Sequence, residues 1–125
     1  MKLFTVEEAN ALLPTVREIV GRIQRAYARV AGWQESARQA AECAQFGGGG
    51  MEGGSRYMAS LTALAESAGQ LEALGVQLKD YERGLIDFPA MRGGRVVLLC
   101  WQMGEGDQLE WWHDLEAGFA GRQPL

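Results

Sequence analysis

Cysteine and histidine are scarce in this chain, and long hydrophobic runs are absent. Only two cysteines occur among 125 residues, too few for the disulfide framework of a small secreted protein. The longest apolar run is Val96–Trp101, whereas a membrane-spanning helix needs about 20 residues. The N-terminus, MKLFTVEEAN, carries acids where a secretory signal would need an apolar segment. These absences predict a protein of the reducing cytoplasm.

Basic residues are in the minority. The chain has 12 basic and 16 acidic residues, a net charge of −4 at pH 7. This balance argues against nucleic acid as a partner. Arg22, Arg25 and Arg29 nevertheless fall at helical spacing. A solvated helix face is the simpler interpretation of this stripe, and a phosphate-binding face is the alternative.

The first third of the chain has the pattern of one long helix. Thr5 and Glu8 form a capping box at its start. Pro14 predicts a kink or a fresh helix start, because proline cannot donate to the preceding turn. The helix is expected to continue to about Gln45. Apolar or aromatic residues recur along it at helical spacing: Val16, Ile19, Val20, Ile23, Tyr27, Val30 and Trp33.

A glycine-rich segment separates this helix from the next one. Residues 47–54 read GGGGMEGG, which predicts a flexible connector rather than a domain boundary. A second helix is expected from Ser55 to Arg83, ended by Gly84 as a left-handed cap. Residues 5–84 are thus expected to form an antiparallel helical hairpin. The apolar face of the second helix comprises Met58, Leu61, Leu64, Ala68, Leu71, Gly75 and Leu78.

After Gly84 the apolar period changes from 3.6 to 2. Short strands are expected over 86–90, 95–102 and 108–113, joined by turns at Gly93-Gly94 and at GEGD. Pro89 restricts the first strand to a sheet edge. The predicted fold class is α+β, with a long antiparallel helical hairpin packed on a C-terminal three-stranded antiparallel β-meander. The meander and its tail occupy 85–125, within a single domain spanning 1–125.

The two turns set a register that brings three potential ligands together. Pairing across them places Asp87 opposite Cys100, with His113 diagonal from Cys100 on the same face. Carboxylate, thiolate and imidazole are metal-ligand types, although this spacing matches no zinc motif. One alternative is a buried thiol beside a histidine that is bonded to a carboxylate. A Cys–His nucleophile is another.

Arg122 is the remaining residue with a suggestive context. It follows Gly118 and Gly121, which allow unusual backbone angles. It is expected to clamp the tail to a carboxylate, or else to bind an anion. Its candidate partners are Asp87, Glu105 and Asp114. The candidate ligand-binding or metal-binding set is therefore Asp87, Cys100, Glu105, His113 and Arg122, and no residue is assigned as catalytic.

The lengths of the predicted elements indicate an uncovered surface. A 30-residue helix is about 45 Å long, whereas a six-residue strand spans about 20 Å. The sheet therefore cannot cover the hairpin. We expect a homodimer formed through the hairpins, or another protein partner. Trp33 on the bare stripe and Trp112 on the outward face of the sheet are the candidate partner contacts.

Three segments of the chain resemble a known family. They are FTVEEANALLP, LKDYERGLIDFPA and LCWQMGEGDQLEWWHDLEAGFAGRQPL, and they are similar to the bacterial family known as domain of unknown function 2203. The resemblance implies a small cytoplasmic bacterial protein without assigned activity, and it adds no catalytic residue. The glycine run at 47–54 departs from the family pattern.

Two functional hypotheses follow. The first is a non-enzymatic protein that acts through homodimerisation or a protein partner. The second is a metal-binding or small-anion-binding protein, with or without catalytic activity, whose site lies on the meander.

Overall fold

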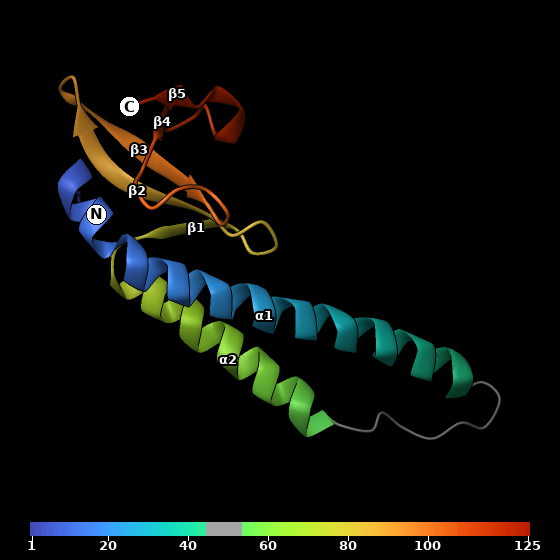
Figure 1. The fold of residues 1–125 in the computed structure, drawn as a ribbon. Coiled ribbons are helices and arrows are strands. Elements are labelled where there is room, and N and C mark those ends of the chain that lie inside the picture. Colours follow the sequence, from blue (N-terminus) through green and yellow to red (C-terminus); the bar gives the residue numbers. More distant parts are fainter. Residues whose placement is uncertain (45–53) are drawn as a thin grey trace.

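The computed structural model describes residues 1–44 and 54–125 and has an α+β fold (Figure 1). Helices α1 (Val6–Ala44) and α2 (Gly54–Ala73) form the hairpin. The sheet lies against the N-terminal half of α1, and the hairpin extends well beyond it (Figure 1). The predicted fold class is confirmed. Of the predicted connector 47–54, all but Gly54 falls outside the described residues.

The sheet has five strands among the described residues rather than the three expected. All neighbours are antiparallel, in the order β1-β2-β3-β4-β5. The additional strands are β1, which the sequence pattern assigned to a helix, and the short β5 in the tail. The bounds are β1 (Gln77–Asp80), β2 (Leu85–Arg92), β3 (Arg95–Gln102), β4 (Trp111–Asp114) and β5 (Gln123–Pro124), with a 3₁₀ turn η1 (Phe119–Gly121) before β5.

Helix α1 begins at the predicted capping box. The Thr5 hydroxyl accepts a hydrogen bond from the Glu8 amide at 3.0 Å, and the Glu8 carboxylate accepts one from the Thr5 amide at 3.1 Å. The helix continues through Pro14 to Ala44. Its dark-blue first turns run at an angle to the remainder (Figure 1), as expected where proline removes a donor from the ladder.

Helix α2 ends earlier than predicted, at Ala73 rather than Arg83. Gly75 has a φ of 87°, and the Val76 amide donates to the Leu71 carbonyl at 3.2 Å. Glycine in this left-handed conformation terminates the helix. The apolar spacing continues past this point to Leu78, which is why the sequence pattern did not reveal the end. The residues that follow Gly75 instead form β1.

Both predicted strand registers are confirmed. Asp87 pairs with Cys100 between β2 and β3, and Cys100 pairs with Trp111 between β3 and β4. The prediction that Pro89 confines its strand to a sheet edge is wrong, because β2 lies between β1 and β3. The ladder with β1 stops at Asp87. Beyond it, the Phe4 amide donates to the Pro89 carbonyl at 2.7 Å, so no strand requires the missing proline N–H.

The core lies between α1 and one face of the sheet. Trp112, expected on the outward face as a partner contact, is 7% exposed and belongs to this core. That expectation is wrong, because the side chains that alternate with Trp112 in β4 are the ones that point away from the helices. The main core side chains are Ala9, Leu13, Val16, Val20, Ile23, Ile86, Phe88, Leu99, Trp101 and Trp112. None of the described helices is apolar enough over a sufficient length to cross a membrane.

Candidate metal centre

Three potential ligands lie together on the sheet face that points away from the helices. Cys100 neighbours the core residue Trp101, and successive strand residues point to opposite faces. Asp87, Cys100 and His113 come from β2, β3 and β4 and are 2%, 1% and 2% exposed. One ligand atom from each lies within 4.8 Å of the other two. The confirmed registers are what bring these three side chains together.

The backbone fixes the tautomer of His113. Its Nδ1 lies 2.8 Å from the carbonyl oxygen of Asp114. A carbonyl only accepts, so Nδ1 must carry a proton. The other nitrogen, Nε2, lies 3.1 Å from a carboxylate oxygen of Asp87. A metal-binding histidine has this arrangement, in which one nitrogen donates to a carbonyl and the other faces the remaining ligands.

Burial raises the pKa values of two groups in the cluster. Loss of solvent raises the pKa of the Asp87 carboxyl above its usual value of 3.8, although His113 and Lys79 pull that pKa down. Burial also raises the pKa of the Cys100 thiol to about 12, and the charge of Asp87 adds to the rise. At neutral pH Cys100 is therefore a thiol. A nucleophilic cysteine needs a lowered pKa and access to substrate, so the geometry argues against a Cys–His nucleophile.

Arg122 and Glu105 form a separate ion pair beside the cluster. One guanidinium nitrogen, Nη1, lies 3.0 and 2.9 Å from the two carboxylate oxygens of Glu105. The same nitrogen is 3.9 Å from the Cys100 sulfur and lowers the pKa of that thiol. Of the three partners considered for Arg122, the structure selects Glu105. Arg122 is therefore the tail clamp, and it lies next to the thiol.

The C-terminal tail covers this face of the sheet. The Arg122 guanidinium lies 4.1 Å from the ring centre of Phe119 and 4.9 Å from that of Trp111. The Glu105 carboxylate, in turn, accepts a hydrogen bond from the Gln102 amide at 2.6 Å. The tail is thus tied to the end of β3 and to β4. This packing shields the neighbouring cluster, whose three side chains are at most 2% exposed.

The structure separates the sequence candidates into two groups. Asp87, Cys100 and His113 converge, whereas Glu105 and Arg122 pair with each other at the border. Two contributors were not anticipated: the Asp114 carbonyl, which as a backbone group leaves no signal in the sequence, and the charge of Lys79. Lys79 was hidden because β1 had been assigned to a helix. Trp33 is half-buried on α1 and stays a predicted contact.

The comparisons with known proteins agree with the resemblance noted in the sequence. No curated protein and no solved structure matches the chain. A family model described as "Uncharacterized conserved protein (DUF2203)" matches residues 2–125. The match includes all five candidate site residues and both helices. The chain therefore belongs to the DUF2203 family.

Proposed function

We propose that this protein binds a divalent transition metal of the Zn²⁺ class through Asp87, Cys100 and His113. The observation that carries the proposal is the convergence of three buried ligand atoms within 4.8 Å, with the histidine held in the tautomer that ligation requires. A mixed set of nitrogen, oxygen and sulfur ligands suits Zn²⁺. Because all three side chains are at most 2% exposed, the metal would be shielded from solvent.

Charge balance supports the proposal. A buried cluster is tolerated when its net charge is near zero. A Zn²⁺ ion with one thiolate, one carboxylate and one neutral imidazole is neutral. Without metal, two protons on the same three groups give the same net charge, in agreement with the raised pKa values of Asp87 and Cys100. Metal binding would then release the proton of the Cys100 thiol, and affinity would fall as the pH falls.

The ligands must close in around the ion. Ligand atoms of a tetrahedral zinc site lie roughly 3.5 Å apart, compared with the 4.8 Å span found here. The Arg122 guanidinium beside the sulfur would stabilise the thiolate that forms. The opposite charges of Arg122 and Glu105 cancel, so this ion pair can stay intact when the metal binds.

A zinc-binding assay with paired cysteine variants tests the proposal. We expect the protein, refolded with Zn²⁺ and dialysed, to retain one zinc per chain by elemental analysis. Cys100→Ser should lose that zinc, because it removes the thiolate. Cys43→Ser should keep it, because Cys43 is the exposed cysteine on α1. Zinc loss in the Cys43 variant alone, or no retained zinc in the wild type, would contradict the proposal.

The hairpin supports a second role, homodimerisation. Beyond the sheet, apolar residues on the facing sides of α1 and α2 stay half-buried, so the two helices alone do not close their seam. These residues are Trp33, Ala37, Ala40, Tyr57 and Leu61. Met58 beside them is 60% exposed. The charges there nearly cancel, with Glu35, Glu42 and Glu66 against Arg38 and Arg56. A second copy related by a twofold axis would complete a four-helix bundle.

Sedimentation of two matched methionine variants tests the dimer. The wild type at tens of micromolar is expected to sediment as a dimer. Met58→Glu should be monomeric, because each copy would bring a charge into the apolar interface. Met91→Glu should stay dimeric, since Met91 is similarly exposed, at 54%, but lies at the β2–β3 turn. A compact monomer of the wild type at the same concentration would contradict the proposed dimer.

The two unpaired cysteines support a cytoplasmic location. Cys43 and Cys100 are both free, and a thiolate ligand requires a compartment that keeps thiols reduced. Recovery of the native protein outside the cytosolic fraction would contradict this assignment.

A further inference from the structure

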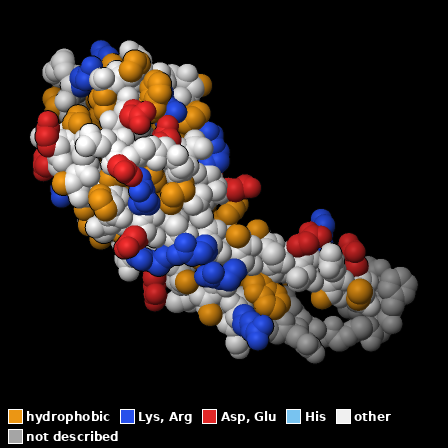
Figure 2. Space-filling model, viewed as in Figure 1, with side chains coloured by type: hydrophobic (Ala, Val, Ile, Leu, Met, Phe, Trp, Pro, Cys, Tyr) orange, Lys and Arg blue, Asp and Glu red, His pale blue; other side chains and the backbone are white. Residues whose placement is uncertain are grey.

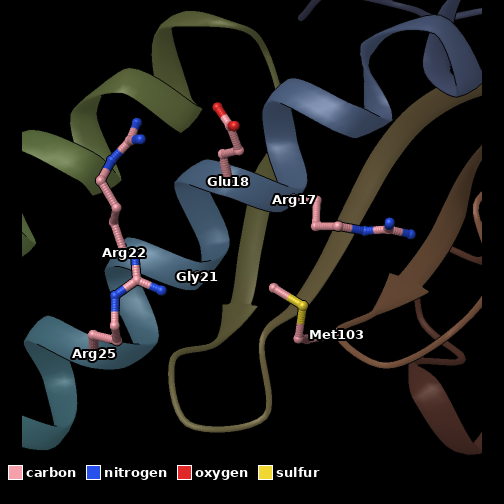
Figure 3. A pocket seen from close by; sticks show the side chains of 6 residues that line it. All are labelled: Arg17, Glu18, Gly21, Arg22, Arg25 and Met103. Carbon is pink, nitrogen blue, oxygen red and sulfur yellow. The ribbon is translucent and has the colours of Figure 1, made fainter.

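An open groove lies where α1 meets the loop after β3 (Figure 3). Its volume is about 440 Å³, within the range of roughly 300–1,000 Å³ that is typical of small-molecule sites. Three of the six lining residues are arginines from one helix. The lining residues are Arg17, Glu18, Gly21, Arg22, Arg25 and Met103.

Arg17 forms one end of the groove and is already neutralised. Its guanidinium lies 2.9 Å from the Asp107 carboxylate and donates to the Gly106 carbonyl at 3.2 Å. It also lies 5.6 Å from the ring centre of Trp101. These contacts fix the position of Arg17, and the Asp107 carboxylate offsets its positive charge.

Arg22 and Arg25 keep their charges available. Arg22 donates to the side-chain oxygen of Gln70 on α2 at 3.0 Å, so a neutral group orients it. In residues 1–44 and 54–125, no acid lies within ion-pair distance of Arg22 or Arg25. Basic side chains gather along this part of the molecule (Figure 2). Two guanidinium groups thus face the groove against one acid, Glu18, in a chain whose net charge is −4.

Gly21 lets the Arg25 side chain approach the helix. A Cβ placed on Gly21 would lie 3.3 Å from a guanidinium nitrogen of Arg25. Without that carbon, the Arg25 side chain folds back along α1 over Gly21, while Arg22 reaches towards α2 (Figure 3). Both arginines line the groove, and their guanidinium groups point in different directions, that of Arg25 over Gly21 and that of Arg22 towards α2 (Figure 3).

We propose that this groove binds a small phosphate-bearing molecule through Arg22 and Arg25. Guanidinium groups match the oxygens of a phosphate group and donate charge-assisted hydrogen bonds to them. The size of the groove fits a phosphate ester or a short polyphosphate. The acidic total disfavours a long nucleic acid. Glu18 limits the affinity, because its carboxylate faces the same space as the anion.

Methionine-methyl NMR provides a test at the site itself. Met103 lines the groove, whereas Met91 lies on the β2–β3 hairpin. In protein labelled at the methionine methyl groups, tripolyphosphate added at constant ionic strength should shift the Met103 signal and leave Met91 unchanged. The combined variant Arg22→Ala, Arg25→Ala should bind at least ~10-fold more weakly, since each lost charge-assisted hydrogen bond contributes about a factor of ten.

Two further variants sharpen the test. Glu18→Gln should bind tripolyphosphate more tightly, because it removes the repelling charge. Arg38→Ala should bind as the wild type does, since Arg38 is an exposed arginine of the same helix that pairs with Glu35. Equal loss in Arg38→Ala, weaker binding in Glu18→Gln, or no shift of Met103 would overturn the proposal. So would tighter binding of a single-stranded oligonucleotide at the same arginines, which would indicate a nucleic-acid surface instead.

Discussion

Replacing His113 with alanine is expected to lower the free energy of unfolding of the metal-free protein by about 3–5 kcal/mol, the sum of about 1–3 kcal/mol for a buried polar group left without its hydrogen-bond partner and the cost of the cavity that alanine leaves. His113 is 2% exposed, and its Nε2 lies 3.1 Å from Asp87, which is equally buried. Alanine leaves the Asp87 carboxyl without that partner, and it also leaves a cavity under the tail.

The cost of this substitution should depend on pH in a defined direction. Burial already raises the pKa of Asp87, and His113 is the main group that lowers it. Removing His113 therefore raises the pKa of Asp87 further. An acid with a raised pKa in the folded state contributes stability that is present below its unfolded pKa and lost as the pH rises through the folded value. His113→Ala should thus be more costly at pH 7 than at pH 4.

Equilibrium denaturation followed by tryptophan fluorescence, with a chelator present, measures both effects. The matched control is Asp114→Ala, the next residue of β4. It keeps the backbone carbonyl and removes a surface ion pair with Arg95 whose side chains are 45% and 62% exposed. Such pairs contribute about 0–1 kcal/mol. If His113→Ala costs no more than Asp114→Ala, or costs more at pH 4 than at pH 7, the described role of the pair is wrong.

Replacing Gly84 with alanine is expected to destabilise the fold by about 3–5 kcal/mol, in the range of a severe core defect. Gly84 has a φ of 66°. A Cβ there would lie 2.9 Å from the Gln24 side-chain nitrogen, the Val20 Cγ1 and the Met103 Cβ. Two of these atoms belong to α1 and one to the loop after β3, so the substitution would push the helix and the sheet apart.

Gly94→Ala provides the control for backbone strain. Gly94 has a φ of 78°, and a Cβ there would meet nothing within 4 Å. Alanine in this left-handed conformation costs about 1–2 kcal/mol. The difference between the two variants in chemical denaturation therefore isolates the steric cost at Gly84. Equal losses of stability would show that helix and sheet do not meet closely at Gly84.

The sequence was most informative about how strands β2, β3 and β4 pair with one another. Gly93-Gly94 forms the two-residue turn between β2 and β3, whereas a loop of eight residues connects β3 to β4, which begins at Trp111 rather than at residue 108 as predicted. Pairing centred on these two connections nevertheless gave the observed registers, and the convergence of Asp87, Cys100 and His113 follows from them. The same period-2 pattern also placed Trp112 opposite to His113. It does not reveal which face the helices cover, and for that reason Trp112 was assigned to the outside.

The missed elements have separate physical causes. Helix periodicity from Leu71 to Leu78 continues across Gly75, so the pattern alone does not distinguish a costly glycine inside a helix from one that ends it. Because the second helix was predicted to continue to Arg83, strand β1 was not predicted, and neither was the influence of Lys79 on Asp87. Strand β5 has two residues, too few for any period. The arginine groove depends on Met103 approaching α1, a tertiary contact between distant segments of the chain.

X-ray absorption spectroscopy at the zinc edge, on protein refolded with one equivalent of Zn²⁺, reports directly on the ligands of the proposed metal centre. We expect a first shell with one sulfur at about 2.3 Å and the remaining nitrogen or oxygen ligands at about 2.0–2.2 Å. Cys100→Ser should lose the sulfur scatterer, and Cys43→Ser should retain it. A shell of nitrogen and oxygen alone in the wild type would contradict a metal centre at Asp87, Cys100 and His113.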